Sequence, residues 1–240
     1  MATNEVTYSD LIARSRRRAD QENSDFCTDA EVLDYINEAI AELHEMMVSE
    51  YELYYVSSTS FSLPTGHADG DNVKELPTSF WKALGCDFGS GGVTRRIRRY
   101  MFQERNAYQS PLLRQGYMAN LFFIVEGNNI RFIPESPPGG TVTLWYIPEP
   151  QKFAGDETGD AARLFSVDRA LANGFERFII LDAAIKMLQK EESDTQILMV
   201  EREGVRKRLM VAGKDRVPGE SRAIADVRVG TAVRSYVNWI

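Results

Sequence analysis

The stretch that decides the fold is residues 28–49, TDAEVLDYINEAIAELHEMMVS, which contains no Gly or Pro. Thr28 is followed three residues later by Glu31, the capping-box pattern of a helix start. Apolar side chains then recur at the spacing of one helix face. They are Val32, Ile36, Ala39, Ile40, Leu43, Met46 and Met47. The stretch therefore predicts an amphipathic helix whose stripe must be buried against another part of the chain.

Three further stretches have helical periodicity, and all but the first lie far along the chain. The first runs from a cap at Thr7 to about residue 20, the second spans residues 168–190, and the third runs from Ser193 to about residue 213. Ser193 and Gln196 repeat the capping-box pattern. We expect residues 28–49 and 168–190 to pack side by side, since each has a wide apolar face and no local partner large enough to cover it.

Between the two pairs of helices the periodicity changes to two, which is typical of β-strands. The predicted strands are residues 53–63, 73–76, 83–88, 93–99, 117–125, 130–133 and 141–147. Gly127, Asn128 and Asn129 predict a hairpin turn, because Gly and Asn tolerate positive φ. The spacing of these strands is that of a sandwich or barrel laid out as a meander.

Together these patterns predict an α+β fold. We expect a four-helix bundle that is discontinuous in sequence, with a β-rich insertion between its second and third helices and an extended C-terminal arm. The predicted bounds are residues 1–52 and 165–213 for the bundle, 53–164 for the insertion and 214–240 for the arm.

Composition and motifs argue against several functional classes. The net charge of −7 disfavours a dedicated nucleic-acid binder, and the N-terminus lacks a signal peptide. No apolar run approaches the roughly 20 residues of a membrane span, so we expect a soluble protein made in a cytoplasm. His44 is predicted at the surface on the polar flank of its helix, and His67 has no second histidine for a metal site. No catalytic, metal-binding or cofactor-binding motif stands out, and the chain is not predicted to be an enzyme.

Two runs of arginine are candidate contact sites. Arg14, Arg16, Arg17 and Arg18 lie near the end of the first helix, where they either complement the helix dipole or form a basic patch for an acidic partner or nucleic acid. The second run consists of Arg95, Arg96, Arg98 and Arg99 on a predicted strand. It is read as a contact to another subunit or to a partner protein, as a solvent-exposed strand face, or as a DNA contact.

The order of the parts resembles a known family. The pattern runs from DYINEAIAELHE through LPTSFWKALG and IRFIPESPPGGTVTLWYIPEP to FERFIILDAAIKML and a charged helix. It is similar to the head-to-tail adaptor, or connector, proteins of tailed bacteriophages over roughly residues 8–209. The resemblance rests on order and spacing rather than on any one diagnostic residue.

The resemblance implies a structural virion protein at the head–tail junction. It implies a homo-oligomeric, typically dodecameric, ring beneath the portal, with tail proteins (a nozzle or tail tube) on its other side and genomic DNA passing through its channel. It implies no membrane and no cofactor. Two other hypotheses stay open: a nucleic-acid-binding protein that uses both arginine runs, and a carbohydrate- or ligand-binding β module that uses Tyr54, Tyr55, Trp81 and Trp145.

The C-terminal residues alternate between apolar and polar side chains from Ala225 onward, which favours a strand. A strand at a chain end needs a neighbour for its backbone groups. We expect it either to add to a sheet of the portal or of an adjacent subunit, with Trp239 as an aromatic anchor, or to pack back on its own β region. The predicted contact residues are Val227, Val229, Val233, Tyr236, Val237 and Trp239.

Overall fold

The computed structural model describes residues 6–22, 26–64, 72–104, 121–133, 139–150, 152–156, 158 and 175–214. Its α-helices are α1 (Tyr8–Arg18), α2 (Asp29–Glu50), α5 (Glu176–Lys190) and α6 (Gln196–Lys214). Two short 3-10 helices, η1 (Glu52–Tyr55) and η2 (Phe102–Glu104), follow α2 and strand β4 (Val93–Arg99) respectively. The Thr28 hydroxyl accepts the Glu31 amide at 3.3 Å, and the Glu31 carboxylate accepts the Thr28 amide at 2.9 Å. This confirms the predicted capping box; a second one joins Thr7 to Asp10 at the start of α1.

Seven strands form one sheet in the order β1-β7-β3-β4-β5-β6-β2. They are β1 (Ser57–Leu63), β2 (Val73–Glu75), β3 (Phe80–Ser90), β4 (Val93–Arg99), β5 (Phe122–Glu126), β6 (Asn129–Ile133) and β7 (Gly140–Pro148). All pairs are antiparallel except β4 with β5, which is parallel. The β5–β6 hairpin turns at Gly127, whose φ is +58°, as its sequence predicts.

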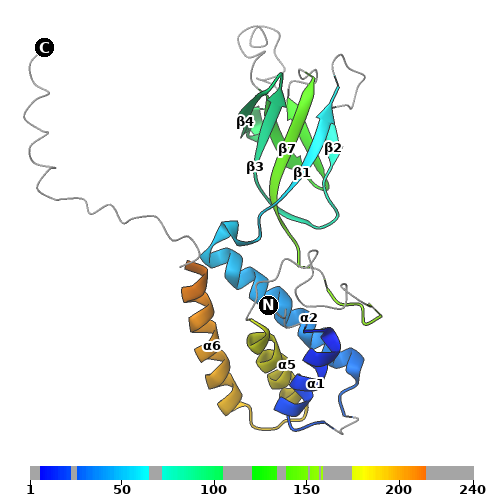
Figure 1. Ribbon diagram of the computed structural model, residues 1–240, viewed down its shortest axis with the longest axis vertical. Coiled ribbons are helices and arrows are strands. Elements are labelled where there is room, and N and C mark those ends of the chain that lie inside the picture. The colour runs from blue at the N-terminus through cyan, green and yellow to red at the C-terminus, as the bar shows by residue number, and fades with distance from the viewer. Residues whose placement is uncertain are drawn as a thin grey trace, which may run out of the picture.

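The helices and the sheet occupy opposite ends of the molecule, and η1 lies at the junction between them (Figure 1). Each end has its own hydrophobic core. Ile36 of α2 and Phe178 of α5 belong to the helical core, which also takes in Ile147 and Phe153 from the chain that leaves the sheet. The sheet encloses a separate core around Phe88 and Phe132. The expected pairing of α2 with α5 is confirmed.

The predicted fold class, a four-helix bundle carrying a β-rich insertion, is wrong. The structure is a mixed α+β fold in which the described part has four α-helices and a seven-stranded, nearly closed, barrel-like sheet. The strands do not follow a meander: the last strand, β7, pairs with both β1 and β3, and β4 pairs in parallel with β5. Alternation marks which residues form strands, but it does not say which strands pair.

Two local predictions also need correction. Residues 53–55 belong to the 3-10 helix η1, so the first strand is shorter than predicted. Ser193 does not cap α6: its hydroxyl donates to Glu191, while the Asp194 carboxylate accepts the Gln196 amide at 2.9 Å. The predicted domain bounds stay a prediction. The predicted C-terminal arm lies outside the described residues, apart from Lys214 at the end of α6.

Candidate interaction surfaces

The second arginine run lies on β4, within the sheet rather than at its edge. Ile97, in the middle of the run, is buried, whereas Arg96, Arg98 and Arg99 are exposed. Arg95 is half-buried, and its guanidinium carbon lies 5.3 Å from the centre of the Phe88 ring. This cation–π contact holds Arg95 against the sheet, so the outward charge of the run comes from the other three arginines.

These arginines have no acidic partner within ion-pair distance among the described residues. Arg96 stands opposite Asp87 on β3, but the Asp87 carboxylate instead accepts a hydrogen bond from the Trp145 indole at 2.7 Å. Arg98 and Arg99 stand opposite Phe122 and Phe123 on β5. The row therefore presents three positive charges that the described part of the chain does not neutralise.

An apolar groove borders the arginine row at the end of the sheet nearest the helices. It has a volume of about 350 Å³ and is lined by Leu53, Val56, Trp145 and Arg96, among others. Leu53, Val56 and Trp145 are all exposed. A partner that contacts this face would therefore meet an aromatic and aliphatic surface flanked by a guanidinium group.

Three arginines of the first run, Arg16, Arg17 and Arg18, make contacts within the chain. Arg16 donates to the Cys27 carbonyl at 2.6 Å and to the Asp29 carboxylate at 2.7 Å. Arg17 lies 3.5 Å from the Glu22 carboxylate, and Arg18 forms an ion pair with Glu201 of α6. These contacts tie α1 to α2 and α6. They favour the structural interpretation of this run over a patch reserved for nucleic acid.

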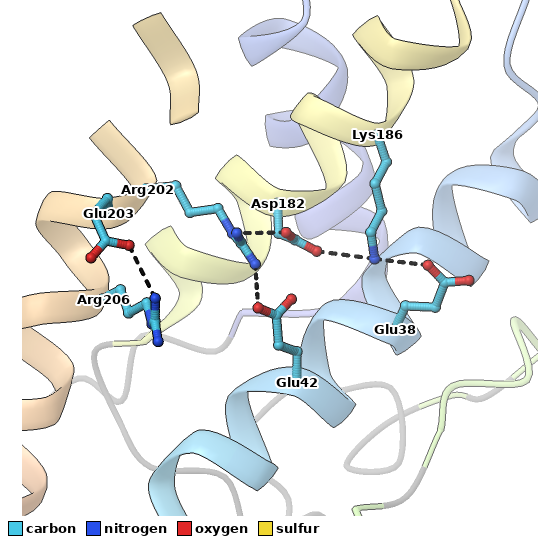
Figure 2. A network of polar contacts seen from close by, with 7 residues as sticks. All are labelled: Glu38, Glu42, Asp182, Lys186, Arg202, Glu203 and Arg206. Atoms are coloured by element: carbon cyan, nitrogen blue, oxygen red, sulfur yellow. Dashed lines mark hydrogen bonds and ion pairs between the residues drawn. The ribbon is translucent and has the colours of Figure 1, made fainter. Parts of the chain in front are cut away.

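A cluster of charged side chains joins α2, α5 and α6 (Figure 2). Asp182 of α5 is buried; its carboxylate lies 3.1 Å from Lys186 Nζ and 2.8 Å from Arg202 Nε. The Arg202 Nε–H does not point along the line that a hydrogen bond requires, so that contact is an ion pair only. Lys186 also donates to Glu38 at 2.7 Å, and Arg202 also pairs with Glu42.

Burial lowers the pKa of Lys186, but its hydrogen bond to Glu38 and the neighbouring Asp182 carboxylate outweigh burial and hold the pKa above its ordinary value. The lysine is therefore charged, and it balances the buried Asp182. This cluster was not predicted from the sequence. The four-residue spacing of Asp182 and Lys186 on a helix is the signal that could have revealed it.

His44 was predicted at the surface, but the structure buries it between the helices and the sheet. Its ring stacks on Tyr55 of η1 with 4.7 Å between centroids, and it meets the edge of Trp81 of β3 at 5.6 Å. Burial lowers its pKa, although a hydrogen bond to the Pro148 backbone opposes the shift. His44 lies four residues after Ile40, at the flank of the apolar stripe, where helical spacing alone does not decide between surface and core. Tyr55 and Trp81 were proposed for a ligand-binding module, but they pack against His44 between the helices and the sheet.

The six predicted contact residues of the C-terminal arm, from Val227 to Trp239, lie outside the described residues. Within the described part, no group of His, Cys, Asp or Glu side chains has an arrangement that could hold a metal ion. No helix in the same part is long and apolar enough to cross a membrane.

A family model described as SU10 adaptor protein matches residues 6–206, which include α1, α2, the whole sheet, α5 and most of α6. No curated protein matches the chain.

Proposed function

Because this chain belongs to the SU10 adaptor protein family, we propose that it joins the head of a tailed bacteriophage to its tail as one subunit of a ring beneath the portal. The observation that carries this proposal is the extent of the family match, which runs from residue 6 to residue 206. The family is one of phage adaptors, so the role is structural and the protein is a virion component. Assembly into a ring bound to the portal goes beyond the family match and is our proposal.

In this proposal the subunits form a closed, dodecameric ring. One side of the ring binds the portal, the other receives the nozzle or tail tube, and genomic DNA passes through the channel. Such a ring needs two different, complementary flanks on each subunit, since head-to-tail contacts close by rotation. The net charge of −7 suits a channel that does not retain DNA.

We assign the portal or neighbouring subunit as the partner of two surfaces. One is the row of Arg95, Arg96, Arg98 and Arg99, whose exposed members lack acidic partners in the described part of the chain. The other is the arm, in which Val227, Val229, Val233, Tyr236, Val237 and Trp239 would add a strand to a sheet of the partner. A nucleic-acid-binding role is less well supported, because Arg16, Arg17 and Arg18 are bound to acidic side chains of this chain.

Deletion of the gene tests the role directly. We expect filled or leaking heads without tails, together with separate tails, in electron micrographs of lysates. Addition of the purified protein should restore joining. Normal tailed particles made without the chain would contradict the proposal.

Variants of the purified protein test the two surfaces. Arg96→Glu combined with Arg98→Glu should weaken binding to purified portal, whereas Arg14→Glu, an exposed arginine of α1, should not. Truncation after residue 224 should leave the melting temperature unchanged and abolish portal attachment. Normal attachment of the truncated protein, or its unfolding, would refute the proposed arm.

A further inference from the structure

Helix α6 has two apolar stripes, and only one of them is covered. Val205 and Leu209 face the helical core and are buried. On the other side of the helix, Ile197, Val200 and Val211 are 79%, 75% and 58% exposed. With Gly204 these three residues fall at spacings of three, four and seven, which is the seam of a helix that packs on a partner.

Gly204 is the centre of this outer stripe, which we call the α6 ridge (Ile197, Val200, Gly204 and Val211). A Cβ atom placed on Gly204 would meet nothing within 4 Å in the isolated subunit. Glycine inside a helix destabilises it relative to alanine, so packing within the subunit does not account for this residue. A glycine at the centre of a ridge allows another backbone to approach closely.

A groove of about 980 Å³ lies between α1 and the start of α2. Ile12, Ala13, Ala30 and Leu33 provide its small and aliphatic lining. Helix α5 lies between α1 and α6, so the groove and the ridge belong to different flanks of the helical unit (Figure 1). We call this surface the α1–α2 groove.

Exposed cations lie beside the ridge, and an exposed carboxylate lies in the groove. Lys207 and Arg208 are exposed next to the ridge and have no ion-pair partner among the described residues. The groove is lined by Glu22 and Asp29 and also by Arg16 and Arg17, which pair with these carboxylates. The Asp29 side chain is nevertheless 75% exposed, whereas that of Arg16 is 13% exposed, so the Asp29 carboxylate faces outward. A ridge seated in the groove would bring a cation of α6 to this exposed carboxylate.

We propose that the α6 ridge of one subunit docks in the α1–α2 groove of a second copy of this chain. This inference rests on the proposed ring, and it names the two flanks that form its helical contact. A symmetric contact between two α6 ridges would close at two copies and leave the groove unused. A contact between ridge and groove instead continues from copy to copy, as a ring requires.

The test uses two full-length variants with opposite defects. Val200→Lys charges the ridge, and Ala13→Arg fills the groove; both positions are exposed helix sites that tolerate the new residues. The matched control is Val93→Lys, which replaces a valine of similar exposure, 67%, in the turn region of the sheet. Sedimentation equilibrium up to about 1 mM detects contacts as weak as a millimolar Kd.

The wild-type protein and Val93→Lys should both associate beyond the dimer as concentration rises. Each of the two interface variants should stay monomeric alone. Their equimolar mixture should form a dimer and stop there, because it contains one intact ridge and one intact groove. A monomeric wild type, a dimeric Ala13→Arg protein, a Val200→Lys protein that matches its control, or a mixture that stays monomeric would each overturn the proposal.

Gly204→Ala gives a second readout that a loss of folding cannot mimic. The melting temperature should rise by about 2 °C, because alanine favours the helix and its Cβ has free space in the subunit. Self-association should nevertheless weaken, since the methyl group separates the ridge from the groove. A stabilised variant that associates normally would contradict close packing at Gly204.

Failure of the ridge–groove contact can be distinguished from failure of the proposed adaptor function. If the wild type attaches to portals and Val200→Lys attaches as Val93→Lys does, with the same number of copies, the inference fails and the adaptor role stands. If the wild type does not attach to portals yet associates through ridge and groove, the portal-bound role fails and the contact stands.

Discussion

Replacement of Asn37 by alanine is the sharpest test of how the two ends of the molecule are joined. Asn37 lies in α2 and is buried. Its side-chain NH2 donates to the Phe153 carbonyl at 2.9 Å, and its side-chain oxygen accepts the Phe153 amide at 2.8 Å. Phe153 follows β7, so this pair of hydrogen bonds fixes the chain that leaves the sheet onto the central helix.

The expected loss in free energy of unfolding follows from the backbone groups that Asn37→Ala leaves without hydrogen-bond partners. Asn37→Ala removes both hydrogen bonds, while the Phe153 amide and carbonyl remain at a buried site. Each unsatisfied buried group costs about 1–3 kcal/mol, so the free energy of unfolding should fall by roughly 2–4 kcal/mol after partial relaxation. The Phe153 ring, which lies 5.6 Å from the Tyr8 ring, should also lose its fixed position.

Urea unfolding followed by circular dichroism measures this change. The matched control is Asn129→Ala, which removes an exposed asparagine side chain of the sheet and should change stability by less than about 0.5 kcal/mol. If Asn37→Ala costs less than about 1 kcal/mol, the two hydrogen bonds do not join α2 to the end of the sheet as we argue.

Two further predictions concern the core. The pKa of His44 lies below its ordinary value of 6.5 because the ring is buried, so the unfolded chain binds more protons in acid and stability should fall as the pH drops through about 6.5. In urea titrations at several pH values, His44→Gln should remove this part of the pH dependence; an unchanged profile would show that the ring is not buried in its neutral form. Ile36→Asp should cost at least about 3 kcal/mol, since it places an unpaired charge in the helical core. A calorimetric melting temperature close to that of the wild type would refute burial of Ile36.

Local elements were predictable because their signals lie in a few neighbouring residues. The Thr28–Glu31 capping box and the positive φ of Gly127 are examples in which one short pattern has one physical meaning. The bounds of β4 were correct for the same reason. The arginines of that strand were correctly placed on a strand, but nothing in the sequence showed that β5 would pair with it in parallel.

The burial of single polar side chains and the order of the strands could not be predicted, because both depend on contacts between distant segments. His44 has the helical position of a flank residue, and only the approach of Tyr55 and Trp81 buries it. Asp182 can be buried in a predicted apolar face because Arg202, from another helix, supplies a counter-charge. Strand order is set by pairings such as β1 with β7, in which the separation of paired residues runs from 77 (Leu63 with Gly140) to 89 (Ser57 with Tyr146). These pairings explain why the fold class was predicted wrongly although most strands were found.

The measurement that tests the central claim most directly is a cryo-electron microscopy reconstruction of the head–tail junction in virions that contain this chain. The proposal predicts a ring of copies between portal and tail, in which helices and barrel-like sheet fit the density and DNA or an open channel lies on the axis. A portal that contacts the tail directly, with no density for this chain at the junction, would contradict the account.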